Sequence, residues 1–303
     1  QGKTAIEADR LSVAEWLDRR RVRGRARWLI SSVIGGYASQ PVEELSLLQH
    51  LWWMASYRRN FTALRTGSAC YLAEGAQEVA RRLAARLPEP PTLETPVDSI
   101  EQEGSSQVSI GSDGRVVCRA RAAIVAVPIP TLGRIRFEPP LPESQADWVA
   151  AVRYGHLTKL GAAAISEVPE RHRSVVGGEP IFWSARMESE LVGYGLRPAR
   201  GRAPDELLAQ LAASFGLRPD EIRGEAVDWS DEPFTGGSYI AFAPGQITRL
   251  GEGLAQAHGL VRFAGAERST KPQSMEGALE SGSRVGAETH SALRESRRPA
   301  EVL

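Results

Sequence analysis

The order of apolar and polar positions predicts a helical start to the chain, across residues 1–64. Ser12-Val13-Ala14-Glu15 has the spacing of a capping box, and Trp16 and Leu17 follow it, which predicts a helix start at Ser12. Pro41 is expected to open another helix that runs through Leu45 and Leu48 to Trp53. We therefore expect a helical layer before any strand.

Further along, short apolar runs alternate with helical patterns. Val108 and Ile110 alternate with polar residues, Asp113-Gly114 supplies a turn, and a second alternating run follows, which predicts a β-hairpin. Residues 122–127 are continuously apolar and stop at Pro128, as in a strand buried on both faces. A short apolar piece lies at 70–72. Other segments predict strands at 95–100, 159–165, 181–183 and 260–263, and helices at 76–87, 207–215 and 275–290.

Strands and helices thus alternate, hairpins are mixed in, and no clean linker separates two halves of the sequence. The expected fold class is α+β or α/β, with a mixed sheet flanked by helices. Two interleaved domains are expected rather than two consecutive ones, and residues 293–303 are expected to be a disordered tail.

Composition narrows the choice of partners. The 303 residues carry 37 basic and 37 acidic side chains, so the net charge is zero and nothing favours nucleic acid or an anionic membrane as a partner. Two cysteines make no disulfide framework and no zinc motif. No apolar run reaches the roughly 18 residues of a membrane span. We therefore expect a cytoplasmic protein without a metal site.

The strongest candidate chemistry lies near the C-terminus. Phe263-Ala264-Gly265-Ala266-Glu267 ends an apolar strand, and Glu276-Gly277-Ala278 lies at the start of the last helix. A strand, a glycine loop and a helix N-terminus together gather backbone N–H groups and the positive end of a helix dipole. Such a site suits a phosphate or the electron-rich edge of a reduced flavin, although a plain structural crossover explains the pattern equally well.

These residues are part of a longer resemblance. The sequence resembles the flavin-containing amine oxidases of the monoamine oxidase type along almost its entire length. The matching segments, in order, are Val127-Pro128, Thr131-Leu132, Phe137-Glu138-Pro139-Pro140-Leu141-Pro142, Trp229, Gly236-Gly237-Ser238-Tyr239, Pro244-Gly245, Phe263-Ala264-Gly265-Ala266-Glu267, Met275-Glu276-Gly277-Ala278 and Ser281-Gly282. The resemblance implies an FAD-binding domain interleaved with a substrate-binding domain.

The resemblance also implies a role for individual residues. Lys159, one of three lysines, would hold a water near the N5 atom of the flavin, and Tyr239 would be one wall of the aromatic cage that guides an amine. Trp229 would pack beside the flavin. The remaining cofactor-binding residues would be Val97, through its backbone at the adenine, Gly265, Ala266 and Glu267 along the ribityl and pyrophosphate part, and Ser274 and Met275, of which Met275 would meet the O2 atom of the ring.

The same resemblance divides the chain. It implies a helical part of the substrate domain at 1–69, part of the FAD-binding domain at 70–147, the sheet and helices of the substrate domain at 148–231, and the C-terminal part of the FAD-binding domain at 232–292.

The sequence departs from the family pattern in three places. No G-x-G-x-x-G follows a strand, so the dinucleotide-binding unit is either on a separate polypeptide, processed off or lost. A small partner subunit that carries it is the favoured expectation. Ser274 replaces the second cage tyrosine, which leaves room for a more polar or bulkier substrate. Ser238 stands where some members have a cysteine that bonds to the flavin, so FAD is expected to be noncovalent.

We therefore expect an FAD-dependent oxidase of an amine or amino acid, in which a hydride passes to flavin N5 and an imine is formed and then hydrolysed. It would be the large subunit of a two-chain enzyme. Two alternatives stay open: a non-catalytic subunit or binding module with the same fold, and an FAD-dependent desaturase or oxidase of a larger metabolite.

Overall fold

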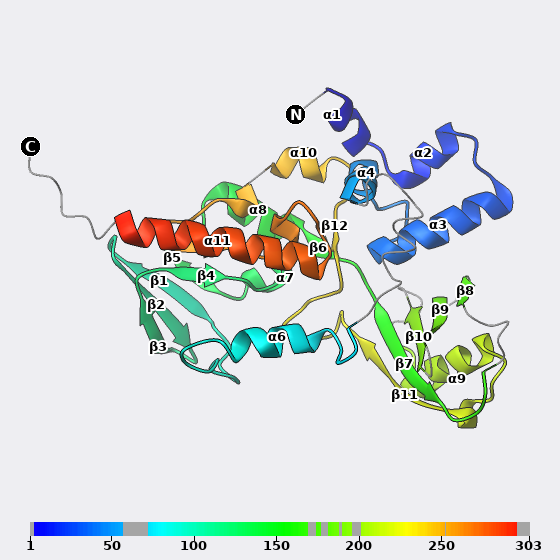
Figure 1. Ribbon diagram of the computed structural model, residues 1–303. Helices are drawn as coiled ribbons and strands as arrows, with labels where there is room; N and C mark the ends of the chain where they lie inside the picture. Colours follow the sequence, from blue (N-terminus) through cyan, green and yellow to red (C-terminus); the bar gives the residue numbers. More distant parts are fainter. Residues whose placement is uncertain are drawn as a thin grey trace, which may run out of the picture.

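A computed structural model of the chain describes residues 3–56, 72–168, 174–176, 181–187, 190–195, 201–251 and 253–295. These residues form a helical layer, a lobe built on a five-stranded sheet, and a second lobe in which the long helix α11 (Met275–Glu295) runs beside the smaller sheets (Figure 1). The short apolar piece at 70–72 and the expected tail lie largely outside the described residues.

The helical layer consists of α1 (Lys3–Asp9), α2 (Val13–Arg19), α3 (Gly24–Ala38) and α4 (Leu47–Ser56). The expected capping box is confirmed: the Ser12 hydroxyl accepts a hydrogen bond from the N–H of Glu15 at 3.0 Å, and the Glu15 carboxylate accepts one from the N–H of Ser12 at 2.9 Å. Val13, Leu17 and Leu45 are almost completely buried where these helices pack together.

The expected helix start at Pro41 is wrong. Residues 42–44 form turns, and α4 begins at Leu47. Backbone groups of the intervening segment bond to other parts of the chain: Leu45 O accepts from Val13 N, and Ser46 N donates to Phe242 O. These tertiary hydrogen bonds use backbone N–H and C=O groups that would have paired with each other in a continuous helix.

The five-stranded sheet has the order β11-β7-β10-β9-β8. Its strands are β7 (Thr158–Ala164), β8 (Ser174–Val176), β9 (Ile181–Met187), β10 (Glu190–Gly195) and β11 (Ile222–Asp228). Helix α9 (Pro204–Ser214) covers one face, where Leu160 and Leu191 of the sheet pack with Leu207 and Leu211. Because side chains alternate along a strand, Lys159 lies on the other face, which α9 leaves uncovered.

The second lobe begins with α6 (Gln77–Ala84) and contains a four-stranded sheet of order β3-β2-β1-β5. The expected hairpin is confirmed as β2 (Gln107–Ser112) and β3 (Arg115–Ala120), joined by Asp113-Gly114. The flanking strands are β1 (Ser99–Glu103) and β5 (Arg136–Glu138).

Two short sheets complete this lobe. The buried run at 122–127 becomes β4 (Ala123–Val125), which pairs in parallel with β13 (Val261–Phe263), and β6 (Arg153–Tyr154) pairs with β12 (Ile240–Ala241). Helices α7 (Ile129–Leu132), α8 (Glu143–Ala151) and α10 (Gln246–Leu250) pack around them. Within the described ranges, we find no helix that is both long and apolar enough to cross a membrane.

The imidazole of His50 on α4 is a buried ionisable group in the helical layer. It lies beside Trp53, with 6.2 Å between the ring centroids, and borders a small void with Tyr37 and Gln273. Burial lowers the pKa of His50 from its ordinary 6.5 to about 4, because the charged form loses its hydration.

This shift predicts a loss of stability on acidification. Below pH 6.5 His50 becomes protonated in the unfolded chain, whereas in the folded chain it stays neutral down to about pH 4. The free energy of unfolding should therefore fall by about 1–3 kcal/mol across this window. H50Q should lose that part of the pH dependence in urea unfolding at several pH values. An unchanged pH dependence in H50Q would contradict the prediction.

Candidate functional site

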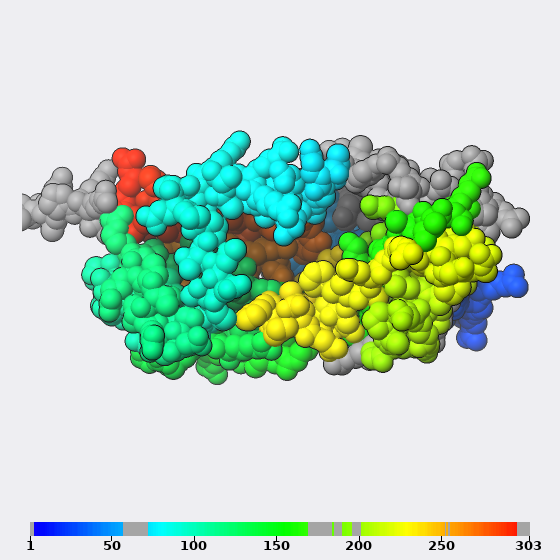
Figure 2. Space-filling model, turned by 90° about the horizontal axis from the view of Figure 1, so that it is seen from below, coloured from blue at the N-terminus to red at the C-terminus, as the bar shows by residue number. Residues whose placement is uncertain are grey.

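A cavity of about 400 Å³ lies between the five-stranded sheet and the loop that precedes α11. Its walls come from both lobes: Pro128, Tyr154, Leu157, Lys159, Tyr194, Trp229, Thr235, Gly237, Ser238, Tyr239 and Glu267. We call it the central cavity. In the view of Figure 2, the surface is hollowed between the segment around α6 and the segment around β11, and residues coloured orange, close before and at the start of α11, lie at the floor of the hollow.

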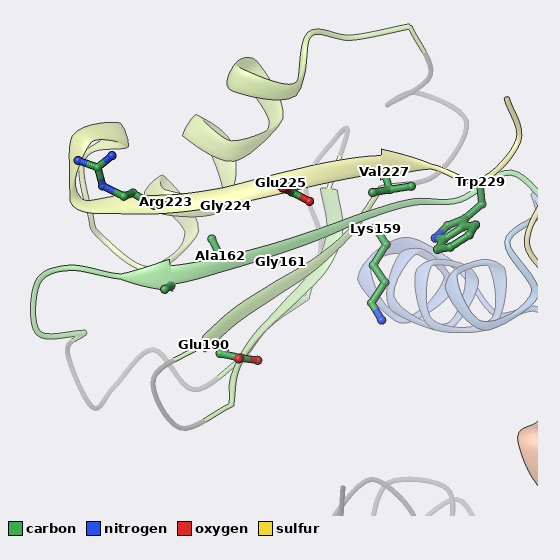
Figure 3. Close-up of a pocket in the computed structure, with 10 residues that line it drawn as sticks. Lys159, Gly161, Ala162, Glu190, Arg223, Gly224, Glu225, Val227 and Trp229 are labelled. Atoms are coloured by element: carbon green, nitrogen blue, oxygen red, sulfur yellow. The ribbon is translucent and has the colours of Figure 1, made fainter. Parts of the chain in front are cut away.

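Lys159 and Trp229 form one end of the central cavity. Lys159 is on β7 and Trp229 follows directly after β11, which pairs with β7. Figure 3 shows the two side chains next to each other on the uncovered side of the sheet. Both residues also line a second hollow, so the two spaces meet at this point.

The second hollow, of about 410 Å³, runs along the uncovered face of the sheet (Figure 3) and is called the trough below. Its floor contains Gly161 and Ala163 of β7, where small side chains leave space. Glu190 on β10 and Arg223 on β11 pair with Ala163 from opposite sides, and Glu225 pairs with Gly161. The trough is therefore a shallow channel with charged walls that leads to Lys159.

Tyrosine side chains line another part of the central cavity. Tyr239 lies just before β12, and Tyr194 lies on β10 opposite Lys159 in the strand register. Burial raises the pKa of Tyr194 above its ordinary value, and the nearby phenols of Tyr239 and Tyr37 raise it further. Tyr194 therefore keeps its proton, and both tyrosines offer aromatic surfaces to the cavity.

Tyr154 and Glu267 form another part of the wall of the central cavity. The Tyr154 hydroxyl donates a hydrogen bond to the Glu267 carboxylate and accepts one from Ile129 N at 3.3 Å. Burial raises the pKa of Tyr154, and the negative charge of Glu267 raises it further. The phenol therefore keeps its proton and acts as a donor at this wall.

The loop around Gly265 needs a residue without a side chain. Gly265 has φ 150°, and a Cβ there would lie 2.7 Å from Glu267 Oε2 and 2.8 Å from Arg268 Nη1. Arg268 is buried, donates to Ala264 O at 2.8 Å, and lies 4.0 Å from Glu267 Oε2. Burial lowers the pKa of Arg268, while Glu267 opposes that shift.

The start of α11 is tied to the cavity wall. Gln273 Nε2 donates to Ile240 O at 2.8 Å, next to Tyr239, and Ser274 Oγ accepts from Gly277 N at 3.0 Å as the helix cap. In the described part of the chain, no acceptor is recorded for the N–H groups of Met275 and Glu276. These donors are available at the positive end of a 21-residue helix.

The structure brings most of the sequence-predicted site residues together. Lys159, Trp229, Tyr239 and Glu267 line one cavity, and Gly265, Ala266, Ser274 and Met275 lie in the loop and helix start next to it. Val97 is outside the cavity, in the exposed segment before β1. The roles of these residues stay predictions.

Sequence reasoning missed or undervalued several wall residues. From the sequence alone, Tyr154 and Tyr194 could line a pocket but are more typical of core aromatics, and no pattern singles out the buried Arg268. For Tyr154, the signal was its position shortly before Lys159 in the segment that joins the lobes. Nothing in the sequence indicates its pairing with Glu267, which is 113 positions away.

Comparisons with known proteins agree with this geometry. Residues 4–288 match the model of a family described as flavin containing amine oxidoreductase. The chain is 27% identical to amine oxidase [flavin-containing] B of Canis lupus familiaris over 320 residues, which cover 95% of this chain and 61% of the relative. It is 23% identical to a pseudooxynicotine dehydrogenase of Pseudomonas sp, covering 96% of this chain and 61% of that protein. The chain thus spans about three-fifths of the length of these curated relatives.

Solved structures share the fold. A cyclohexylamine oxidase from Brevibacterium oxydans superposes with a TM-score of 0.82 at 24% identity, over 97% of this chain and 70% of that one. A putrescine oxidase bound to putrescine superposes with a TM-score of 0.84 at 23% identity, over 96% of this chain and 70% of that one. These likenesses confirm the expected mixed α and β fold class, and the family match confirms FAD as the cofactor expected of the family. This chain belongs to the flavin-containing amine oxidoreductase family.

Proposed function

We propose that this chain carries the substrate side and the flavin-ring side of an FAD-dependent oxidase of amines or amino acids. The observation that carries the proposal is the central cavity, because it gathers Lys159, Trp229, Tyr239 and Glu267 from distant parts of the sequence. The family match supports it independently.

The residues at the cavity fit the ring end of a flavin. Met275 and Glu276 supply backbone donors at a helix N-terminus, which suit the edge of the ring where negative charge develops. Because Gly265 has no side chain, the Glu267 and Arg268 side chains can approach its backbone, and Glu267 is thereby kept in the cavity wall. Ser238, whose hydroxyl donates to Gly155 O at 3.1 Å, provides no thiol for a covalent link, so FAD is noncovalent in this proposal.

When bound, FAD would supply the redox chemistry: it would accept a hydride equivalent from the substrate and pass two electrons to O2, which would yield H2O2. The carbon–nitrogen bond of the substrate would become an imine, which water would hydrolyse. In this proposal Tyr239 and Tyr194 offer aromatic faces to the amine, and Lys159 holds a water in the cavity. Tyr154 fixes the Glu267 carboxylate through its hydrogen bond, and Glu267 is among the residues that would hold the cofactor.

The trough favours a substrate longer than a simple alkylamine. It continues from Lys159 past Gly161 to the row of Glu190 and Arg223, about four residues along β7. At about 3.3 Å per residue this is a path of roughly 13 Å. A larger metabolite that enters the cavity with one end would therefore lie along this face.

A feature of the second lobe favours a partner chain that binds the nucleotide end of FAD. The parallel pair β4–β13 buries Ala123, Val125 and Phe263 on one face, whereas Ile124 on the other face is 45% exposed. Parallel sheets in α/β domains are covered on both faces, so a two-stranded parallel sheet with an open face is incomplete. We propose that a small polypeptide with a G-x-G-x-x-G unit completes this sheet.

The function is tested by purifying the chain alone and with such a partner co-expressed. We expect the visible absorption of oxidised flavin in the complex, and peroxide release from an amine or amino acid in a substrate screen. K159M should lower kcat by at least about tenfold with little change in FAD content, whereas K3M, in the helical layer, should match the wild type. Lack of flavin under every condition would leave the non-catalytic alternative and refute the proposal.

The partner surface is tested with I124K. A lysine at Ile124 places a charge in the proposed apolar contact, so the co-expressed complex should elute as separate chains in size-exclusion chromatography. I165K is the matched control, because Ile165 is 59% exposed at the end of β7 in the other lobe. A complex that survives I124K, or that I165K disrupts equally, would contradict the assignment of this surface.

The Tyr154–Glu267 pair is tested with Y154F. Loss of the hydroxyl leaves a half-buried carboxylate without its donor, so the free energy of unfolding at neutral pH should fall by about 1–3 kcal/mol. The double variant Y154F/E267Q should be more stable than Y154F, because the neutral amide of glutamine costs less to bury without a donor than the charged carboxylate does. A Y154F protein as stable as the wild type in urea unfolding would show that the pair contributes nothing.

A further inference from the structure

His156 is a buried side chain that lines neither the central cavity nor the trough. It lies in the segment that leaves β6 and enters β7, three residues before Lys159. Its Nδ1 atom is 2.5 Å from Ser230 Oγ, and its Nε2 atom is 3.4 Å from Asp228 Oδ2. The imidazole therefore contacts the two residues that flank Trp229.

The neighbours of His156 favour one of the two ring nitrogens as the site of its proton. The Asp228 carboxylate favours a proton on Nε2, although 3.4 Å is longer than a good hydrogen bond. Nδ1 is then the acceptor for the Ser230 hydroxyl. Asp228 Oδ1 also accepts from Ser230 N at 2.9 Å, so Ser230 contacts both His156 and Asp228. With both nitrogens facing these residues, His156 is not positioned to act as a base on a substrate.

The backbone on each side of His156 is held as well. His156 N donates to Ser39 O at 2.9 Å, at the end of α3. A Cβ on Gly155 would lie 2.5 Å from the same oxygen, so the segment is pressed against the helical layer. On the other side, Trp229 N donates to Leu157 O at 3.1 Å. The segment thus joins the helical layer to the end of β11.

The backbone of Trp229 is held on both sides, because Trp229 N donates to Leu157 O and Trp229 O accepts from Thr235 Oγ1 at 2.9 Å, but these bonds leave the indole side chain free to rotate. It is 38% exposed and lies just beyond β11, yet it borders both the cavity and the trough next to Lys159. A half-exposed side chain at a strand end would sample several rotamers unless its neighbours were fixed. The contacts of His156 with Asp228 and Ser230 supply that restraint.

We propose that His156 is a positioning residue that holds Trp229 as the wall between the central cavity and the trough. The part of this proposal that concerns the flavin rests on the proposed function; the restraint on Trp229 does not. Loss of the imidazole would release Trp229 and widen the junction beside Lys159 without removing any group that touches the flavin or the substrate.

The restraint is tested on the chain without cofactor. W229F is introduced into the wild type and into the H156F, H156N and H258F variants. In each case the fluorescence of the W229F protein is subtracted from that of the protein that keeps Trp229, which leaves the emission of Trp229. We expect the acrylamide quenching constant of this emission to rise about twofold in H156F, because a more mobile side chain is more accessible. H156N, whose amide oxygen takes the place of Nδ1 as acceptor, should stay near the wild type.

His258 provides the matched control. Its Nε2 atom is 2.8 Å from Pro139 O, in the other lobe, so H258F removes a comparable contact away from Trp229. Equal quenching in H156F and the wild type would overturn the proposal, and so would an equal rise in H258F. If H156F does not fold by circular dichroism, S230A removes the same hydrogen bond and should give the same rise.

A double-mutant cycle on FAD binding tests whether His156 acts through Trp229. H156F and W229A should each raise the Kd for FAD about fivefold, and the double variant should be no weaker than W229A. Effects that multiply in the double variant would show that His156 acts by another route and would overturn the proposal. The cycle is run with the dinucleotide-binding partner co-expressed. If FAD does not bind to the wild-type complex, the proposed function fails, while the quenching result still decides the restraint on Trp229.

Discussion

One short segment, residues 154–159, holds the site together, because it crosses between the lobes and bonds to a different wall at almost every step. Tyr154 donates to Glu267, Gly155 accepts from Ser238, and Leu157 accepts from Trp229. Gly237 shows how close this approach is, since a Cβ there would lie 2.4 Å from Tyr154 Cβ. The cavity exists because these contacts keep the sheet of one lobe against the glycine loops of the other.

The chemistry of the site follows from this arrangement. Lys159 is fixed by its position in a central strand, whereas the Gly265 loop and the start of α11 are fixed by the lobe behind them. Neutral phenols and an indole surround the space, and burial raises the pKa of both Tyr154 and Tyr194, so these tyrosines keep their protons. This arrangement supports the proposal that the cavity takes an uncharged amine and leaves the redox chemistry to a cofactor.

Local patterns in the sequence were enough to predict the capping box at Ser12, the hairpin at Asp113-Gly114 and the strand before Gly265, because each depends on neighbouring residues. The helix start after Pro41 could not be predicted, because distant backbone groups bond to the segment before Leu47. The candidate site was predictable only through the family resemblance. Its pairings of Tyr154 with Glu267 and of His156 with Ser230 join residues far apart in sequence, and no local pattern encodes them.

The most direct test is a crystal structure of the protein prepared with FAD and the dinucleotide-binding partner. We predict that the flavin ring occupies the central cavity, with the N–H of Met275 directed at the ring and Lys159 beside it. A structure in which the Met275 and Glu276 amides pack against other protein groups, while FAD is absent from the cavity or bound elsewhere, would contradict this account.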